Sequence, residues 1–219
     1  EIKNSWRIEQ DGDAKPAING ARSVGLKITN NFGGTIQSDT KAINMSGGTG
    51  AVITNAGDIT ADGDYGIKST GTDLTVNNTG TILANKRTLE FSADATGAKI
   101  TNSGSILGTT SRTIIILGDN ATITNQSGGE IRAGSEIGSD GSVDANHVNA
   151  VLFNNTDSNY KGTLENYGKL TAAQSTVKVG MQNVVINNYS GAIIQHTDDI
   201  GGWASISIGK DNATITNKG

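Results

Sequence analysis

The sequence contains no cysteine and a single proline, and only 4% of its 219 residues are aromatic. Without cysteine there is no disulfide framework and no metal site built on thiolates. No run of about 18 apolar residues occurs, so no stretch reads as a transmembrane helix. The 17 basic and 21 acidic residues are scattered and give a net charge of −4, which argues against a nucleic-acid-binding surface.

Helical periodicity is also missing from the chain. Apolar residues do not recur at i, i+3, i+4 and i+7 for more than one turn, and 30 glycines interrupt the sequence. The apolar residues are mostly isoleucine and valine, which favour strands. The sequence therefore predicts an all-β chain.

One short unit recurs along the sequence. Residues 53–59 read Ile-Thr-Asn-Ala-Gly-Asp-Ile, and residues 100–106 read Ile-Thr-Asn-Ser-Gly-Ser-Ile. The asparagines of successive units have spacings of 25, 23, 24, 23, 41, 22 and 29 residues; they are Asn30, Asn55, Asn78, Asn102, Asn125, Asn166, Asn188 and Asn217. A recurring period near 24 indicates a solenoid, in which each repeat contacts only its neighbours.

Each repeat contains three short candidate strands. They are clearest at residues 58–61, 65–69 and 74–78, at 105–108, 113–117 and 121–125, and at 169–172, 176–180 and 184–188. Strands this short bury one face only when repeats stack on one another. The prediction is a right-handed parallel β-helix with three strands per rung and about eight rungs, on the order of 40 Å tall. Residues 1–219 are interpreted as one β-helix, a fragment of a longer array.

The alternation of side chains assigns an inner and an outer face. Ile53, Asn55 and Ile59 share the inner face, whereas Thr54 and Asp58 point outward. The eight repeat asparagines are predicted to form a structural ladder, amide on amide through the rungs. Asparagine and glycine at this turn are also expected to adopt the left-handed backbone conformation.

The spacing of 41 residues is interpreted as a loop insertion at about 134–149 rather than a lost repeat. A second long connection spans residues 196–205. Loops that leave a regular scaffold often carry function. The candidate binding residues are therefore Asp140, Asp144 and His147 in the first loop, and His196, Asp198, Asp199 and Trp203 in the second. The other tryptophan, Trp6, is expected to cover the first rung.

The chain resembles the passenger domains of bacterial autotransporters in three features. These are the Ile-Thr-Asn-x-Gly-x-Ile unit, its period near 24, and the stretch Gly-Asp-Asn-Ala-Thr-Ile-Thr-Asn at 118–125, which is nearly repeated at 209–217. Autotransporters are surface proteins of Gram-negative bacteria that are secreted through their own C-terminal barrel. The resemblance implies a location at the bacterial cell surface or outside the cell, with the membrane barrel and the signal peptide outside these residues. Passengers include adhesins, self-association factors, proteases and esterases.

The expected function is that of a non-enzymatic surface adhesin rod, without cofactor or metal. Its partner would be a host cell-surface protein or glycan, or an identical chain on another cell, and no nucleic acid. Binding is expected in the two long loops, or on the outward polar wall that includes Thr54 and Thr101. The remaining alternative is a stalk that holds a binding tip located elsewhere.

A carbohydrate-active β-helix, a polysaccharide hydrolase or lyase, is the alternative function. Glycoside cleavage needs two carboxyl groups that flank the bond. Asn155-Thr156-Asp157 and Asp198-Asp199 are similar to motifs of polygalacturonase-like enzymes. The Gly-His-Gly and Arg-x-Lys motifs of those enzymes do not follow, so the non-enzymatic interpretation is preferred.

Overall fold

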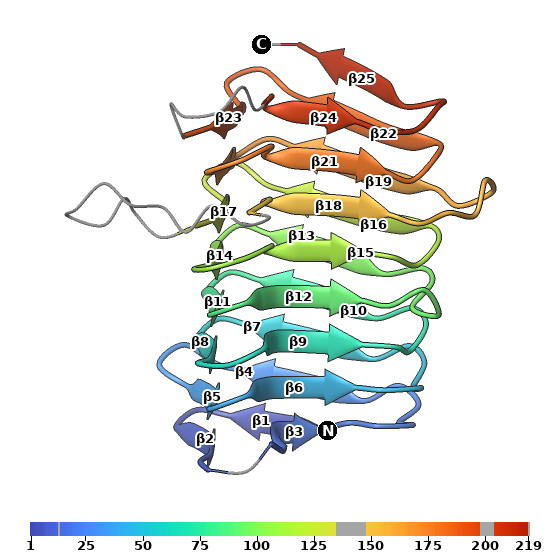
Figure 1. Ribbon diagram of the computed structural model, residues 1–219. Helices are drawn as coiled ribbons and strands as arrows, with labels where there is room; N and C mark the ends of the chain where they lie inside the picture. The colour runs from blue at the N-terminus through green and yellow to red at the C-terminus, as the bar shows by residue number, and fades with distance from the viewer. Residues whose placement is uncertain (13, 135–147, 198–203, 219) are drawn as a thin grey trace.

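The computed structural model describes residues 1–12, 14–134, 148–197 and 204–218, and within these ranges it contains strands and turns but no helix. The strands form three parallel sheets, stacked as a β-solenoid of about eight turns. The chain coils in a right-handed sense from the N-terminus to the C-terminus (Figure 1). The predicted fold, a right-handed parallel β-helix with three strands per rung, is confirmed.

Each rung contributes one strand to each sheet. Sheet A consists of β1 (Ile2–Asn4), β4 (Lys27–Asn30), β7 (Val52–Asn55), β10 (Thr75–Asn78), β13 (Lys99–Asn102), β16 (Ala121–Asn125), β19 (Gly162–Asn166), β22 (Val184–Asn188) and β25 (Thr214–Asn217). Sheet B consists of β2 (Arg7–Gln10), β5 (Thr35–Ser38), β8 (Asp58–Ala61), β11 (Thr81–Ala84), β14 (Ser105–Gly108), β17 (Glu130–Ala133), β20 (Lys169–Ala172) and β23 (Ile193–His196). Sheet C consists of β3 (Pro16–Asn19), β6 (Lys41–Met45), β9 (Tyr65–Ser69), β12 (Arg87–Phe91), β15 (Ile114–Ile116), β18 (Val151–Asn154), β21 (Val177–Gly180) and β24 (Ile206–Ile208).

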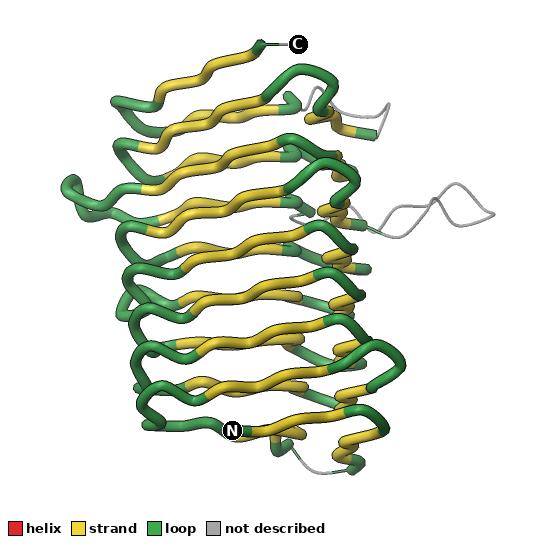
Figure 2. The backbone as a smooth tube through the Cα atoms, turned by 180° about the vertical axis from the view of Figure 1, so that it is seen from behind, coloured by secondary structure: helices red, strands yellow, loops and turns green. Residues whose placement is uncertain are grey.

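The rungs are in register, so equivalent residues of consecutive rungs lie directly above one another (Figure 2). One inward column of sheet A runs through Ile28, Ile53, Val76, Ile100, Ile123, Leu164, Ile186 and Ile215. Comparable columns of isoleucine, leucine and valine run through sheets B and C. Each fully buried side chain of this size contributes roughly 1.5–3 kcal/mol.

The inner and outer faces are as the alternation predicts. Ile53, Asn55 and Ile59 are fully buried, whereas Thr54 and Asp58 are exposed. The nine strand ranges are also confirmed, apart from residues 74, 113, 117 and 176, which lie just outside strands. Period-2 alternation and turn residues therefore identify these short strands almost to the residue.

The long spacing after Asn125 reflects an insertion, as expected. β16 pairs directly with β19, with Ile123 opposite Leu164 and Asn125 opposite Asn166. β15 pairs directly with β18 in the same way. The additional residues therefore belong to the connections between β17 and β19 in the sequence, mainly the one from β17 to β18, and the pairing leaves no place for a lost rung.

The repeat asparagines form one continuous ladder through the rod. The side-chain Nδ2 of each donates to the Oδ1 of the asparagine in the next rung, at 2.8–3.0 Å from Asn30 to Asn217. Asn4 adds a ninth member, because its Nδ2 lies 2.7 Å from Asn30 Oδ1. Each Nδ2 inside the ladder also donates to backbone carbonyls of its own rung or the next. The amides therefore link the backbones of consecutive turns in addition to linking one another.

The expectation of left-handed backbone at the ladder asparagines is wrong. None of them has a positive φ; among non-glycine residues such angles occur where sheet C passes into sheet A, as at Asp73 (56°), Asn120 (57°) and Asn183 (53°). For glycine the expectation is confirmed in the ladder turns that carry extra residues, since Gly33, Gly128 and Gly191 have positive φ of 77°, 82° and 78°. Most glycines of the ladder turn are needed for a different reason. A Cβ on Gly57 would lie 2.1 Å from the carbonyl oxygen of Gly34, and one on Gly104 would lie 2.2 Å from that of Gly80. Glycine here permits close stacking of turns.

Candidate binding edge

The corner at which sheet A passes into sheet B, here termed the A–B edge, presents aromatic side chains to solvent. Trp6 and Phe32 lie in the first two turns of this edge and are 85% and 90% exposed. The expectation that Trp6 covers the first rung is therefore wrong. Backbone bonds fix the two turns against each other: Asn31 N donates to Asn4 O at 2.8 Å, and Thr35 N donates to Trp6 O at 2.7 Å. The backbone therefore anchors both residues on adjacent rungs, and their rings project into solvent.

Two tyrosines occupy the same edge near the other end of the rod. Tyr167 and Tyr189 follow ladder asparagines in consecutive rungs, and their rings stack with centroids 4.0 Å apart and planes 7° from parallel. The hydroxyl of Tyr189 donates to Glu165 Oε2 at 2.7 Å. Lys218 Nζ lies 4.7 Å from the Tyr189 ring centroid. The aromatic pair is therefore fixed from the side by a carboxylate and from above by a cation.

This arrangement predicts a pH-dependent contribution to stability. Hydrogen bonding to Tyr167, and then to the Glu165 carboxylate, raises the pKa of Tyr189 above its ordinary value. A raised pKa in the folded state means that the stabilisation is complete below the unfolded pKa of about 10 and is lost as pH rises above it. Thermal unfolding between about pH 9 and pH 11 should therefore show a smaller alkaline loss for Tyr189→Phe than for the wild type. Parallel profiles of the two proteins would contradict the assignment.

An open hollow of about 410 Å³ lies beside Tyr167. Its lining residues come from three consecutive rungs: Ser127, Gly128, Gly129, Glu130, Tyr167, Gly168, Lys169, Gly191 and Ile193. Glycines from three turns contribute to it, so a ligand can approach the backbone closely. Tyr167 and Ile193 add apolar surface, since they are 41% and 44% exposed.

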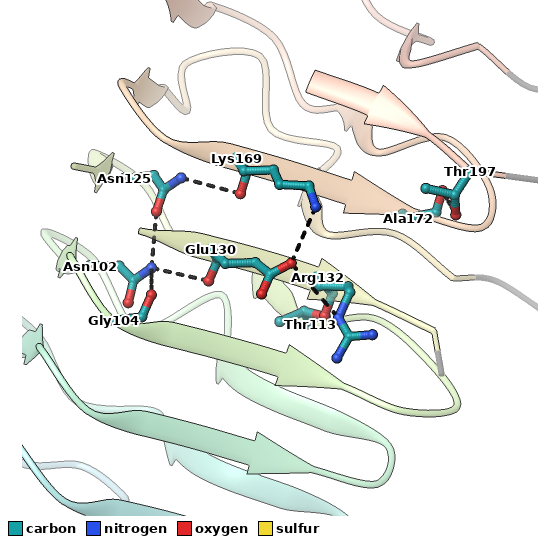
Figure 3. Close-up of polar contacts among 9 residues, drawn as sticks. All are labelled: Asn102, Gly104, Thr113, Asn125, Glu130, Arg132, Lys169, Ala172 and Thr197. Atoms are coloured by element: carbon teal, nitrogen blue, oxygen red, sulfur yellow. Dashed lines mark hydrogen bonds and ion pairs between the residues drawn. The ribbon is translucent and has the colours of Figure 1, made fainter. Parts of the chain in front are cut away.

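Charged side chains from two strands of sheet B, Glu130 and Lys169, line this hollow. Figure 3 shows their polar contacts. Glu130 Oε1 lies 3.7 Å from Lys169 Nζ and 4.0 Å from Arg132 Nε. The backbone carbonyls of Glu130 and Lys169 accept from the ladder amides of Asn102 and Asn125, at 3.2 and 3.4 Å. The ladder therefore positions the strand ends from which the charged side chains project. An aromatic face next to a donor and an acceptor can stack a ring and hydrogen-bond its substituents.

The candidate residues in the long loops are mostly not placed by the structure. Asp140, Asp144, His147, Asp198, Asp199 and Trp203 lie outside the described residues. His196 is the last residue of β23 and is partly buried, with Nδ1 3.4 Å from Ser205 Oγ. It lies at the opposite end of sheet B from the A–B edge, so it does not join the hollow.

Of the carboxylates proposed for the enzymatic alternative, Asp157 lies among the described residues and Asp198 and Asp199 do not. Asp157 follows β18, whereas Asp198 and Asp199 belong to the connection that precedes β24. Asp157 also has a structural role, because its Oδ1 accepts from Asn159 N at 2.9 Å and its N–H donates to Asn155 Oδ1 at 2.9 Å. These are local turn bonds of the kind asparagine and aspartate commonly make.

The aromatic edge was not identified from the sequence, although a signal was present. Tyr167 and Tyr189 each follow a ladder asparagine directly, and Trp6 and Phe32 each stand two residues after one. An outward turn position occupied by aromatics becomes visible once the repeats are aligned on the asparagines.

The chain gave no match to a family model, a curated protein or a solved structure. Over the described ranges, no group of three or more histidine, cysteine, aspartate or glutamate side chains is placed to hold a metal ion. The same part of the chain contains no helix that is long and apolar enough to cross a membrane.

Proposed function

We propose that this chain is a non-enzymatic adhesin rod displayed at the surface of a bacterium. It attaches the cell to a host cell-surface glycan or protein, or to an identical chain on another cell. The observation that carries the proposal is the exposure of Trp6 and Phe32, at 85% and 90%, on adjacent rungs of the A–B edge. Large aromatic rings at a surface are favoured anchors for a partner, because each can bury about 150–250 Å².

The rod supports this role mechanically. Turns at the edge are bonded to the turns below through backbone groups, so the rings are carried on a rigid element rather than a free loop. Little conformational entropy is then lost when a partner binds, which favours affinity. The hollow beside Tyr167 adds a second contact on the same edge. Two contacts on one rod can strengthen attachment together when a partner spans both.

The polar wall remains the alternative adhesive surface on the same rod. The outward column of sheet A runs through Thr29, Thr54, Asn77, Thr101 and Thr124. Such a row can pair with an identical rod through many weak contacts, which add up only over a long register.

The double variant Trp6→Ala with Phe32→Ala should reduce attachment of cells or coated beads by about tenfold or more, which corresponds to the loss of about 1.4 kcal/mol in binding. Exposed side chains have few contacts to lose, so the thermal unfolding midpoint should barely change. Val24→Ala is the matched control, because Val24 is 81% exposed but lies in the connection from sheet C to sheet A.

Three further variants separate the alternatives. If attachment survives the double variant but is lost with Thr54→Lys and Thr101→Lys, the polar wall is the adhesive surface. If it is lost only on deletion of residues 134–146 or with Trp203→Ala, the long loops bind. Attachment that survives all of these changes would contradict an adhesive role for this part of the chain.

A further inference from the structure

Two arginines lie at the same level of adjacent rungs on sheet C. Leu89 of β12 pairs with Ile114 of β15, and Arg87 and Arg112 each stand two residues before these partners. The strands are parallel, so this register places Arg87, the first residue of β12, next to Arg112, which stands just before β15. Their charges therefore repel each other across one rung spacing.

Arg87 already has partners. Its Nη1 donates to the Tyr65 hydroxyl at 2.7 Å and to Glu90 Oε2 at 2.8 Å. The other carboxylate oxygen of Glu90, Oε1, lies 3.4 Å from Lys68 Nζ. The carboxylate of Glu90 is thus shared between two cations.

Arg112 has no such partner. Its Nε is buried and makes no hydrogen bond, and no carboxylate lies within ion-pair distance among the described residues. Burial, and then the neighbouring charge of Arg87, lower the pKa of Arg112. A buried donor without an acceptor is destabilising, and a neighbouring like charge adds to the strain. The described residues therefore supply no acceptor with negative charge to this Nε.

We propose that Arg87 and Arg112 together bind one oxyanion group, a sulfate or a carboxylate. Guanidinium groups match such groups in shape and donate two parallel hydrogen bonds to them. Lys68, Arg87 and Arg112 supply three positive charges against the carboxylate of Glu90, in a chain of net charge −4. The nearby carboxylate of Asp64 is already paired with Lys86 and leaves this excess unchanged. The local excess of two positive charges attracts an anion even though the protein as a whole repels it.

The site goes beyond the proposed adhesive edge and does not depend on it, because it lies on sheet C and not on the A–B edge. The oxyanion has two sources with the same chemistry: a free inorganic anion, or a sulfate or uronate group on an acidic polysaccharide. Glu90 lowers the affinity of the site for an added anion, because its carboxylate is bound to Arg87 and competes with any ligand.

The test is a titration of the purified chain with sodium sulfate against sodium chloride at constant ionic strength, followed by the ¹⁵N-labelled arginine Nε resonances. Saturable shifts are expected at Arg87 and Arg112 of the wild type. Arg112→Gln should weaken sulfate binding by about tenfold or more, as for loss of a charge-assisted pair. Lys178→Gln should leave it unchanged, since Lys178 is an exposed cation on the outer face of the same sheet. Glu90→Gln should strengthen it.

Folding is checked in the same series. Because the buried Nε of Arg112 makes no hydrogen bond, Arg112→Gln should keep or raise the thermal midpoint in the absence of sulfate. Parallel titrations with a sulfated polysaccharide, a polyuronate and neutral dextran identify the source. Binding of a charged polymer that depends on Arg112 assigns the oxyanion to a glycan, and binding of inorganic sulfate alone assigns it to a small anion. If no anion binds, or if Lys178→Gln weakens binding as much as Arg112→Gln, the proposal is overturned.

Discussion

Replacing Asn102 with alanine should lower the free energy of unfolding by about 3–5 kcal/mol, because several buried polar groups lose a partner and each such loss costs about 1–3 kcal/mol. Asn102 is fully buried, and its Nδ2 donates to Asn125 Oδ1 at 2.9 Å, Gly104 O at 3.1 Å and Glu130 O at 3.2 Å. Its Oδ1 accepts from Asn78 Nδ2 at 2.8 Å. The substitution therefore interrupts the ladder in both directions.

Asn77→Ala is the matched control, since Asn77 lies on β10 next to a ladder residue but points outward and is only partly buried. Its removal should change the free energy of unfolding by about 0.5 kcal/mol or less. Urea unfolding followed by far-ultraviolet circular dichroism measures both variants. Equal losses for Asn77→Ala and Asn102→Ala would show that the inward amides are not what stabilises the turns.

The second large effect is expected for Gly80→Ala. A Cβ at this position would lie 2.2 Å from the carbonyl oxygen of Gly57 and 2.7 Å from the carbonyl carbon of Ala56. Both contacts are with backbone, and the Gly57 carbonyl accepts from Thr81 N at 2.9 Å, so it cannot move without loosening that bond. The expected loss is about 3 kcal/mol, the upper end of the usual range for overpacking.

Gly209→Ala provides the comparison for this variant. Its Cβ would meet only Val179 O, at 3.5 Å, which is an ordinary contact. The chain should therefore tolerate it with little change in the urea midpoint. If both glycine variants are equally stable, the turns of consecutive rungs are less closely stacked than the structure shows.

The fold was predictable because both the facing of the side chains and the alignment of the rungs follow regular patterns in the sequence. Alternation assigns residues such as Ile53 and Thr54 to opposite faces, and the asparagine period aligns the rungs. The reason for each turn glycine was less predictable. Glycine is needed both where φ is positive and where the backbones of two turns approach closely. The sequence around Gly57 does not distinguish these uses; the backbone of the neighbouring turn does.

The candidate edge depends on contacts between residues that are far apart in sequence. Tyr167 and Tyr189 become a stacked pair only when two rungs are placed in register, and the hollow needs turns from three rungs. Sequence reasoning favoured the long loops because they break the period. The same bias missed Arg112, since nothing in a single repeat shows that its neighbour one rung below is another arginine.

The asparagine ladder has a polarity. Every amide between Asn4 and Asn217 donates a hydrogen toward the C-terminal rung and accepts one from the N-terminal side, with Asn4 as the first donor and Asn217 as the last acceptor. At any level of the rod, the surface facing the C-terminus therefore offers N–H groups in this column, and the surface facing the N-terminus offers oxygen. Two rungs fit only when they face the same way, because a reversed rung would place like groups against each other. The ladder therefore makes rung addition directional. Each folded rung accepts the next rung in one orientation only.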